Sequence, residues 1–161
     1  AGISVMSFHT RLDAVAGGVN DTLAGLLGLQ DVTPFGEGIG RVGTLDNALT
    51  LCKFAEKVRS VTGAPAVLCG DAGRPVRRVA LLGGSGSDDV PAALEAGADT
   101  YLSGELAYHY LADAREMGIN LLAAGHFHTE NPVCRTLSGM LTAIDPALTV
   151  DLYDSNRTIL F

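Results

Sequence analysis

The chain has 161 residues, of which 47% are hydrophobic and 18% charged, and this composition is typical of a globular protein rather than a disordered or fibrous one. The formal net charge of −7 excludes nucleic acid as an expected partner, because an acidic surface repels phosphate backbones. No apolar run reaches the roughly 20 residues of a membrane helix, so we expect no membrane partner.

The N-terminal half alternates apolar segments with glycines. Residues 3–8 are apolar and partly β-branched, which predicts a strand. Apolar residues at helical spacing predict a helix over residues 19–27 and a second over 45–62, which Gly63 would end. Between these helices, residues 31–42 contain several glycines and are expected to form a loop and a short strand.

From residue 66 onward, strand-like and helix-like segments alternate with short connections. This pattern is typical of a largely parallel sheet covered by helices. We therefore predict one compact α/β unit over residues 1–161, with a mixed, largely parallel sheet flanked by helices in a two-lobed arrangement, and any lobe boundary near residues 63–75. The expected strands are 66–69, 76–82, 100–102, 121–124 and 149–153, and the expected helices are 90–96, 106–117 and 129–141.

The three cysteines match neither a disulfide framework nor a zinc-ribbon spacing. We interpret Cys52, Cys69 and Cys134 as buried thiols of a reducing compartment. The first residues also do not have the pattern of a signal peptide. The sequence thus predicts a cytoplasmic location.

Two segments that follow predicted strands place a histidine four residues before an acidic residue. His9 precedes Asp13, and His126 precedes Glu130. If each segment is helical, the imidazole and the carboxylate share one face and can converge on a borderline metal such as zinc, manganese or iron. The same spacing also suits surface hydrogen bonds or helix caps, so both interpretations stay open. His128 could line the same pocket only if the backbone is extended there, and we interpret it as a surface histidine.

Two further motifs point less clearly to chemistry. The glycine-rich segment 83–89 is superficially like a phosphate-binding loop, but it lacks the third glycine of the dinucleotide pattern and the Gly-Lys of a P-loop, and Asp88 and Asp89 suit a helix N-terminus better. Glu105, His109 and Asp113 lie four apart on one expected helical face. We interpret that face as solvated; the alternative is that Glu105 or His109 moves protons at a pocket rim.

Several segments, in the same order, resemble the NGG-interacting-factor-like proteins, a family with two metal ions and ring-shaped assemblies whose members are often named GTP cyclohydrolase I type 2 homologues. The match extends over most of the chain and is more specific than any single motif. It includes His9-Thr-Arg-Leu-Asp13, Gly18-Val-Asn-Asp21, Leu27-Gly-Leu29, Gly38-Ile-Gly-Arg-Val-Gly43, Gly83-Gly-Ser-Gly86, Ala98-Asp-Thr-Tyr-Leu-Ser-Gly-Glu105 and Gly125-His-Phe-His-Thr-Glu130.

The resemblance implies a metal-dependent hydrolase acting on a small, nucleotide-like molecule. Asp13, His126 and Glu130 would be metal ligands, with Asp13 between two ions, and His9 would be a reacting residue beside them. Glu105 and His109 would face the same cavity. The two ions would be zinc, manganese, iron, cobalt or nickel. The resemblance also implies a homo-oligomer, specifically a hexamer.

One departure from the family pattern affects the expected site. Members normally have a preceding N-terminal segment with an adjacent His-His pair, and this chain contains no such pair. We therefore expect the chain to be the C-terminal part of a longer family protein, whose remaining ligands lie elsewhere. Two other functions stay open: a non-enzymatic metal carrier or regulatory ring scaffold, and an interaction module with an empty site.

Overall fold

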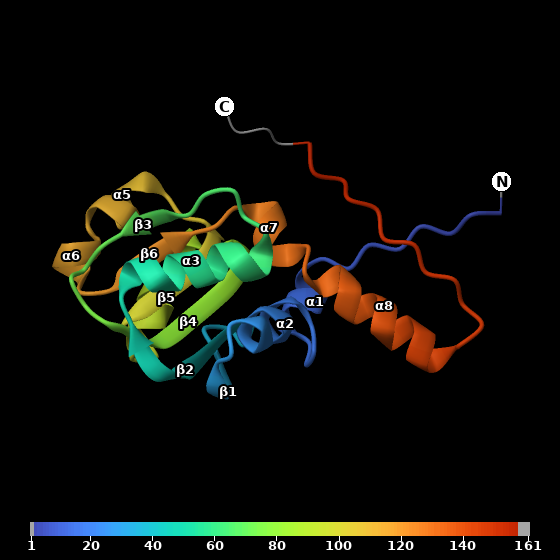
Figure 1. Ribbon diagram of the computed structural model, residues 1–161, viewed down its shortest axis with the longest axis horizontal. Coiled ribbons are helices and arrows are strands. Elements are labelled where there is room, and N and C mark those ends of the chain that lie inside the picture. Colours follow the sequence, from blue (N-terminus) through green and yellow to red (C-terminus); the bar gives the residue numbers. More distant parts are fainter. Residues whose placement is uncertain (1, 158–161) are drawn as a thin grey trace.

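The computed structural model describes residues 2–157, and its centre is one six-stranded sheet in the order β1-β2-β4-β5-β6-β3 (Figure 1). The three central strands β4, β5 and β6 are parallel, and antiparallel strands extend the sheet at both edges. The predicted mixed α/β sheet is thus confirmed, with its parallel part in the middle. The strands are β1 (Gln30–Phe35), β2 (Gly40–Leu49), β3 (Leu68–Gly70), β4 (Val76–Ser85), β5 (Thr100–Glu105) and β6 (Asn120–Ala123).

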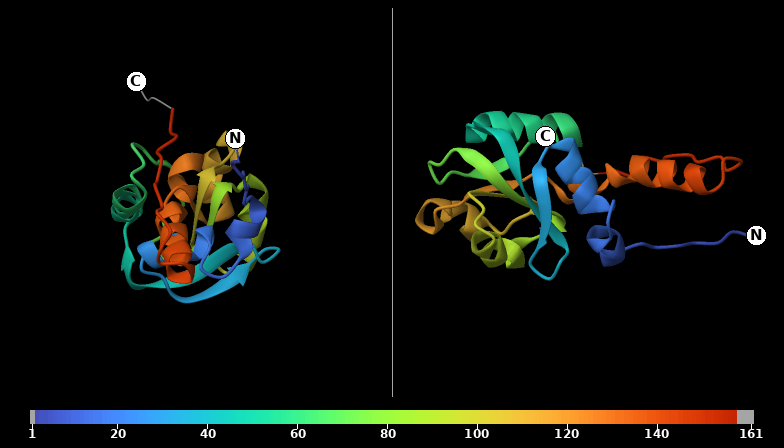
Figure 2. Two further views of the ribbon diagram at one scale, coloured as in Figure 1. Left: turned by 90° about the vertical axis from the view of Figure 1, so that its right-hand side faces the viewer. Right: turned by 90° about the horizontal axis from the view of Figure 1, so that it is seen from below.

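Helices cover both faces of this sheet (Figures 1 and 2). Helices α2 and α3 pack on one face, and α4 and α6 contribute buried residues to the other. None of the helices within residues 2–157 is long and apolar enough to cross a membrane. The helices are α1 (Thr10–Ala14), α2 (Val19–Leu26), α3 (Leu51–Thr62), the 3-10 turn η1 (Ser87–Asp89), α4 (Val90–Glu95), α5 (Tyr108–Ala112), α6 (Ala114–Met117), α7 (His126–Glu130) and α8 (Val133–Ile144).

The central strand β4 shows why its sequence is an almost continuous apolar run. Val79 and Leu81 pack into the core under α2 and α3, while Ala80 and Leu82 pack into the core on the opposite face. Successive side chains of a strand point to opposite faces, so a strand covered on both sides must be apolar at nearly every position. This arrangement fixes the carboxyl ends of β4, β5 and β6 at one edge, where α7 begins.

The predicted helix over residues 45–62 is wrong at its N-terminal end. Residues 45–49 belong to β2, which pairs with β4 as far as Leu49 opposite Val76. The helix starts only at Leu51, because the Thr50 side chain accepts a hydrogen bond from the Lys53 N–H and caps it. Gly63 ends the helix in the left-handed conformation, as predicted.

The expected helices after β5 and β6 are divided in the structure. The segment 106–117 forms α5 and α6, which are separated at Asp113. The segment 129–141 falls into α7 and α8. Each division changes which side chains share a helical face, and this affects the site described below.

The two strands expected near the chain ends are also wrong. Within the described residues, 2–8 and 149–153 form neither helix nor strand. Their apolar side chains are exposed, with Ile3 at 80% and Val5 at 90%. A β-branched run forms a strand only beside a partner strand, and neither segment has one in the sheet. Both segments, together with α8, project away from the body of the molecule (Figures 1 and 2).

Candidate metal site

Helix α7 begins directly after β6 and carries the second predicted histidine–carboxylate pair. Gly125 has a φ of +89° and lets the chain turn from the strand into the helix. One helical turn then brings His126 Nε2 to 3.2 Å from Glu130 Oε1. Both side chains keep contact with solvent, at 48% and 39% exposed. The predicted convergence of this pair is therefore present.

A second carboxylate, Glu105, meets the same imidazole from the neighbouring strand. Glu105 is the last residue of β5, and its Oε1 lies 3.3 Å from His126 Nδ1. The expected helical face of Glu105, His109 and Asp113 does not exist, because Glu105 is in a strand and Asp113 ends α5. His109 is exposed, stacks near Tyr110 with ring centroids 4.4 Å apart, and lines neither cavity beside His126.

Asp13 approaches this pair from α1, on a separate part of the chain. Burial raises the pKa of Asp13 above its usual value, and the charges of His9 and His126 partly offset that rise. Asn20 holds α1 in place by donating a hydrogen bond of 3.2 Å to the Asp13 carbonyl. His9 itself is exposed, with its Nδ1 2.9 Å from the Thr10 hydroxyl.

The pKa of Glu130 is also raised, and its causes connect the two halves of the site. Burial is the largest cause, His126 acts against it, and the negative charge of Asp13 adds to it. Two carboxylates that disfavour each other's ionised form attract a cation, because the cation offsets both charges. The structure thus brings Asp13 into one electrostatic cluster with His126 and Glu130, from which it is separated by more than a hundred residues in sequence.

Gly84 lies directly beneath His126 and Glu130. Its φ is +77°, and its N–H donates to the Thr129 hydroxyl at 3.0 Å. A Cβ atom at this position would lie 2.5 Å from Glu130 Oε1 and 3.2 Å from His126 Nε2. The absence of a side chain at Gly84 therefore leaves room for the ends of the His126 and Glu130 side chains. Asp88 and Asp89 form the turn that leads into α4, consistent with the predicted helix N-terminus.

Two cavities meet at α7. A cavity of about 330 Å³ is lined by His9 and Asp13, and a cavity of about 950 Å³ is lined by Glu105 and His126. Glu130 and Phe127 line both. His128 lines the larger cavity and is half-buried, so its interpretation as a surface histidine is only partly correct.

The residues of this cluster do not form a complete ligand set. Within residues 2–157, no three His, Cys, Asp or Glu side chains converge closely enough to hold a metal ion. The assignment of Asp13, His126 and Glu130 as ligands therefore stays a prediction. The donor chemistry fits a divalent ion, since two carboxylates and an imidazole are ordinary ligands of the predicted metals.

The cysteines are a correction to the sequence interpretation. Cys52 and Cys69 are exposed and Cys134 is partly buried, so the first two are not buried thiols. All three are free. Cys52 lies outside the buried face of α3, which Phe54 and Val58 form.

Comparison with known sequences gives one consistent result. Residues 1–158 match the family described as Duf34/NIF3 (NGG1p interacting factor 3). A protein from a Nostoc species called "GTP cyclohydrolase 1 type 2 homolog" is 36% identical over 151 residues, covering 89% of this chain and 57% of the relative. A protein of the same name from Clostridium perfringens is 37% identical over 139 residues, covering 81% and 53%. The chain spans little more than half the length of these curated relatives.

Solved structures agree with this assignment. A crystal structure of a Thermus thermophilus protein superposes with a TM-score of 0.79 at 29% identity, covering 93% of this chain and 60% of that one. The reduced HcgD protein from Methanocaldococcus jannaschii superposes with a TM-score of 0.71 at 28% identity, covering 84% and 55%. On the family match over almost its whole length, the chain belongs to the DUF34/NIF3 family.

Proposed function

We propose that this chain binds divalent metal ions through Asp13, His126 and Glu130 and contributes to hydrolysis of a nucleotide-like small molecule. The observation that carries the proposal is the geometry at the carboxyl edge of the parallel strands, where His126 lies 3.2 Å from Glu130 and Glu130 lines the same cavity as Asp13. That edge is where open α/β sheets usually bind ligands. The name of the relatives, GTP cyclohydrolase 1 type 2 homolog, supports the substrate class.

The residues divide into roles according to their contacts. One nitrogen of His126 faces Glu130 and the other faces Glu105. If Nε2 is the ligand atom, Nδ1–H donates to Glu105, which fixes the tautomer and the ring orientation, as second carboxylates do for metal-bound histidines. Glu105 is therefore a positioning residue in this proposal. His9, beside Asp13 in the smaller cavity, is the proposed group that accepts and returns protons.

The proposed ions are two of zinc, manganese, iron, cobalt or nickel. When bound, such an ion lowers the pKa of a coordinated water to near neutrality and so makes hydroxide available. Asp13, acting between two ions, would be the shared carboxylate. We propose further that the protein works in the cytoplasm as a homo-oligomer, specifically a hexamer, in which ligands from outside this chain complete the site.

A non-enzymatic metal carrier is the second candidate. The observation that favours it is the openness of the site: His126 is 48% exposed and Glu105 58%, and the described residues contain no closed ligand set. Ligands that stay in contact with solvent allow an ion to exchange. A regulatory ring scaffold would use the same ligands, and an interaction module would use none of them.

Metal content and turnover together test these candidates. The protein is loaded separately with each of the five metals, dialysed, and analysed for bound metal. We expect stoichiometric binding of at least one metal, and its loss in an Asp13→Ala, Glu130→Ala double variant. An Asp46→Ala, Glu95→Ala double variant is the matched control, because both carboxylates are exposed and lie outside both cavities.

Turnover is then measured with the loaded protein and GTP or guanosine, following product release. Product that disappears in the Asp13→Ala, Glu130→Ala variant supports the hydrolase. Metal binding without product from any of these substrates supports the carrier. Absence of metal from the wild-type protein after loading would remove the metal proposal altogether.

A further inference from the structure

The larger cavity beside α7 has the size and the lining of a small-molecule site. Its volume of about 950 Å³ lies at the upper end of the range for ligand pockets, which is about 300–1,000 Å³. Most of its wall is apolar. The apolar side chains come from the connection before β3, from β3 itself, from the residue after β5, from the end of β6 and from α7; they are Pro65, Ala66, Leu68, Leu106, Ala123, Ala124 and Phe127.

Polar side chains gather at the end of the cavity that adjoins the metal cluster. They include Glu105, His126 and Glu130, which form the two contacts described above. Carboxylates accept hydrogen bonds and therefore suit the ring N–H and amino groups of a heterocycle. Phe127 and His128 also line the cavity; their rings are perpendicular with centroids 5.5 Å apart, so each can offer its own face to a ligand ring. Such surfaces bind bases by stacking.

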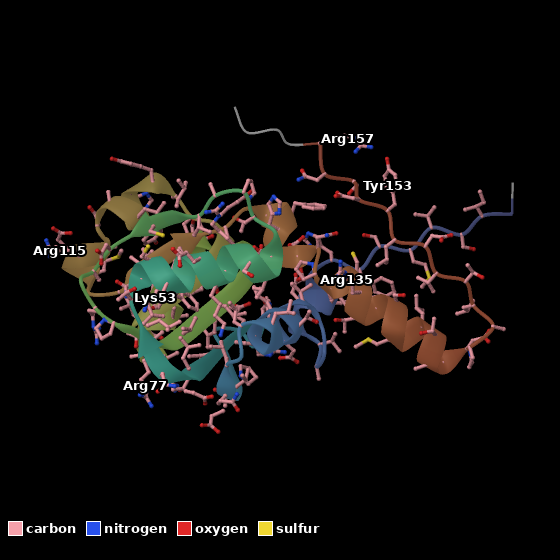
Figure 3. All side chains as sticks on the ribbon, in the orientation of Figure 1. Lys53, Arg77, Arg115, Arg135, Tyr153 and Arg157 are labelled. Atoms are coloured by element: carbon pink, nitrogen blue, oxygen red, sulfur yellow. The ribbon has the colours of Figure 1, made fainter. Side chains whose placement is uncertain are left out.

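The cavity offers a phosphate no permanently charged cation among its described lining residues. Among the described residues that line it there is no lysine or arginine. Figure 3 shows Lys53, Arg77 and Arg115 at the outer surface of the body, away from the end of the sheet where α7 lies. The nearest cation along the chain, Arg157, instead donates a hydrogen bond to the Tyr153 hydroxyl and lies 5.7 Å from the centre of that ring.

The glycine-rich segment at the end of β4 does not supply a phosphate cradle either. The space that a side chain on Gly86 would occupy is filled by Tyr101 and Ser103, and Tyr101 donates a hydrogen bond of 3.0 Å to the Gly86 carbonyl. The corresponding space at Gly84 is filled by Glu130 and His126. The N–H groups of Gly84 and Gly86 already donate to the Thr129 hydroxyl and the Glu105 carbonyl, and a phosphate at Gly84 would also meet the Glu130 carboxylate, which repels it.

We infer that this cavity binds the uncharged part of the ligand, a nucleobase or nucleoside, and that the side chains of this chain do not hold a phosphate there. The choice of a nucleoside rests on the proposed function; the preference for an uncharged ligand rests on the lining alone. Carboxylates at one end attract N–H donors and repel phosphates, and the aromatic wall takes the flat ring.

Calorimetric titration of the metal-free protein at low salt tests this inference. Guanosine and GTP are the probes, and chelator-treated protein is used so that no bound ion can attract the triphosphate. Guanosine should bind at least about tenfold more tightly than GTP, because like charges face each other only in the GTP complex. Equal or tighter binding of GTP would overturn the inference, and so would the absence of guanosine binding.

Two variants make the result specific to this cavity. Leu68 is 63% exposed and lines it, so Leu68→Arg introduces a cation at its wall without disturbing the core. We expect a gain in GTP affinity of at least about threefold with Leu68→Arg and none with Leu94→Arg, an exposed position on α4 outside the cavity. Similar gains in both variants would contradict the inference. The assay needs neither metal nor turnover, so failure of the proposed hydrolase would leave its outcome unaffected.

Discussion

The Oε1 atom of Glu130 lies 2.5 Å from the point where a Cβ atom on Gly84 would stand. A Cβ atom at residue 84 would therefore force the ends of the Glu130 and His126 side chains to move. The φ of +77° is a second reason why residue 84 is a glycine, since residues with a Cβ atom rarely adopt this conformation. The position of the candidate ligand Glu130 thus depends on the glycine at residue 84.

Replacing Gly84 should change both the metal affinity and the stability of the protein, and the two effects can be measured separately. In Gly84→Ala the methyl group displaces Glu130 and His126, so we expect metal affinity to fall by at least about tenfold, as for other disturbances of ligand position. The positive φ should also cost about 1 kcal/mol or more in the free energy of unfolding. Metal competition titration and urea denaturation measure the two effects.

The matched control is Gly118→Ala. Gly118 has a φ of +70° and no atom within 4 Å of its would-be Cβ, so it carries the same backbone strain without the collision. It should lose stability by a similar amount and keep its metal affinity. Equal affinity losses in both variants would show that Gly84 acts through stability alone.

Removal of Glu105 should weaken metal binding although Glu105 is not a proposed ligand. Its carboxylate lies 3.3 Å from His126 Nδ1 and orients the ring. In Glu105→Ala we expect metal affinity to fall about 10- to 100-fold. Unfolding of the metal-free protein should change by less than about 0.5 kcal/mol, because a 58% exposed ion pair contributes little to stability.

Glu116→Ala, an exposed carboxylate on α6, is the control for Glu105→Ala. Metal competition with a chromophoric chelator gives the affinities of both variants. Unchanged affinity in Glu105→Ala would rule out the positioning role. Restoration of part of the lost affinity by Glu105→Asp would support it, since the shorter carboxylate keeps the charge and the acceptor.

The centre of the fold could be predicted from sequence because local and long-range interactions agree there. β4 is apolar at consecutive positions, and only a strand covered on both faces needs that pattern. Around residue 45 the local pattern and the long-range strand pairing disagree. Leu45 and Leu49 fit a helical stripe, but pairing of β2 with β4 draws them into the sheet. No local pattern reports a partner strand that is 30 residues away.

In the candidate site, too, the contacts within one helix could be predicted from sequence and the contacts between elements could not. His126 and Glu130 meet because helical geometry alone brings residues four apart together. The local pattern places Glu105 on a helical face, and only the family resemblance places it at the cavity of the site. Its contact with His126 depends on the parallel register of β5 and β6, which places Ser103 beside Ala123. The Gly83-Gly84 pair indicates an unusual backbone conformation in the sequence. The contact of Gly84 with the Glu130 and His126 side chains is visible only in three dimensions.

Asn20 is a buried polar residue whose removal should destabilise the fold strongly. It is fully buried, accepts a hydrogen bond from the Gly83 N–H at 2.8 Å, and donates to the carbonyls of Ile39 and Asp13. Asn20→Ala leaves these buried groups without a partner, so we expect a loss of about 2–4 kcal/mol in the free energy of unfolding. Urea denaturation measures it.

The exposed Asn47 on β2 provides the control, and Asn47→Ala should change stability by less than about 0.5 kcal/mol. Because Asn20 also holds the backbone at Asp13, the metal affinity of any folded Asn20→Ala protein should fall as well. A variant as stable as Asn47→Ala would show that water replaces the lost hydrogen bonds.

The Asp21–Arg41 pair should make stability depend on acid pH. Burial alone would raise the pKa of Asp21, but the hydrogen bonds from the Arg41 side chain and the Gly17 N–H, with the Arg41 charge, outweigh it and hold the pKa below the usual 3.8. Folding therefore favours the ionised form. Its contribution is fully present above the unfolded value and is lost as the pH falls through the lower, folded value.

Asp21→Asn removes this contribution and leaves the nearly buried guanidinium of Arg41, 6% exposed, without its counter-charge. At neutral pH we expect a loss of about 2–4 kcal/mol, at the lower end of values for broken buried pairs because Asp21 keeps 28% of its side-chain surface. The difference between wild type and variant should shrink as the pH is lowered through and below 4, since the wild-type carboxylate then becomes protonated. Urea denaturation at a series of pH values measures this difference, in which the opposing contributions of Asp13 and Glu130 cancel. A difference that stays constant down to the acid limit would mean that Asp21 stabilises the fold by its hydrogen bonds and not by its charge.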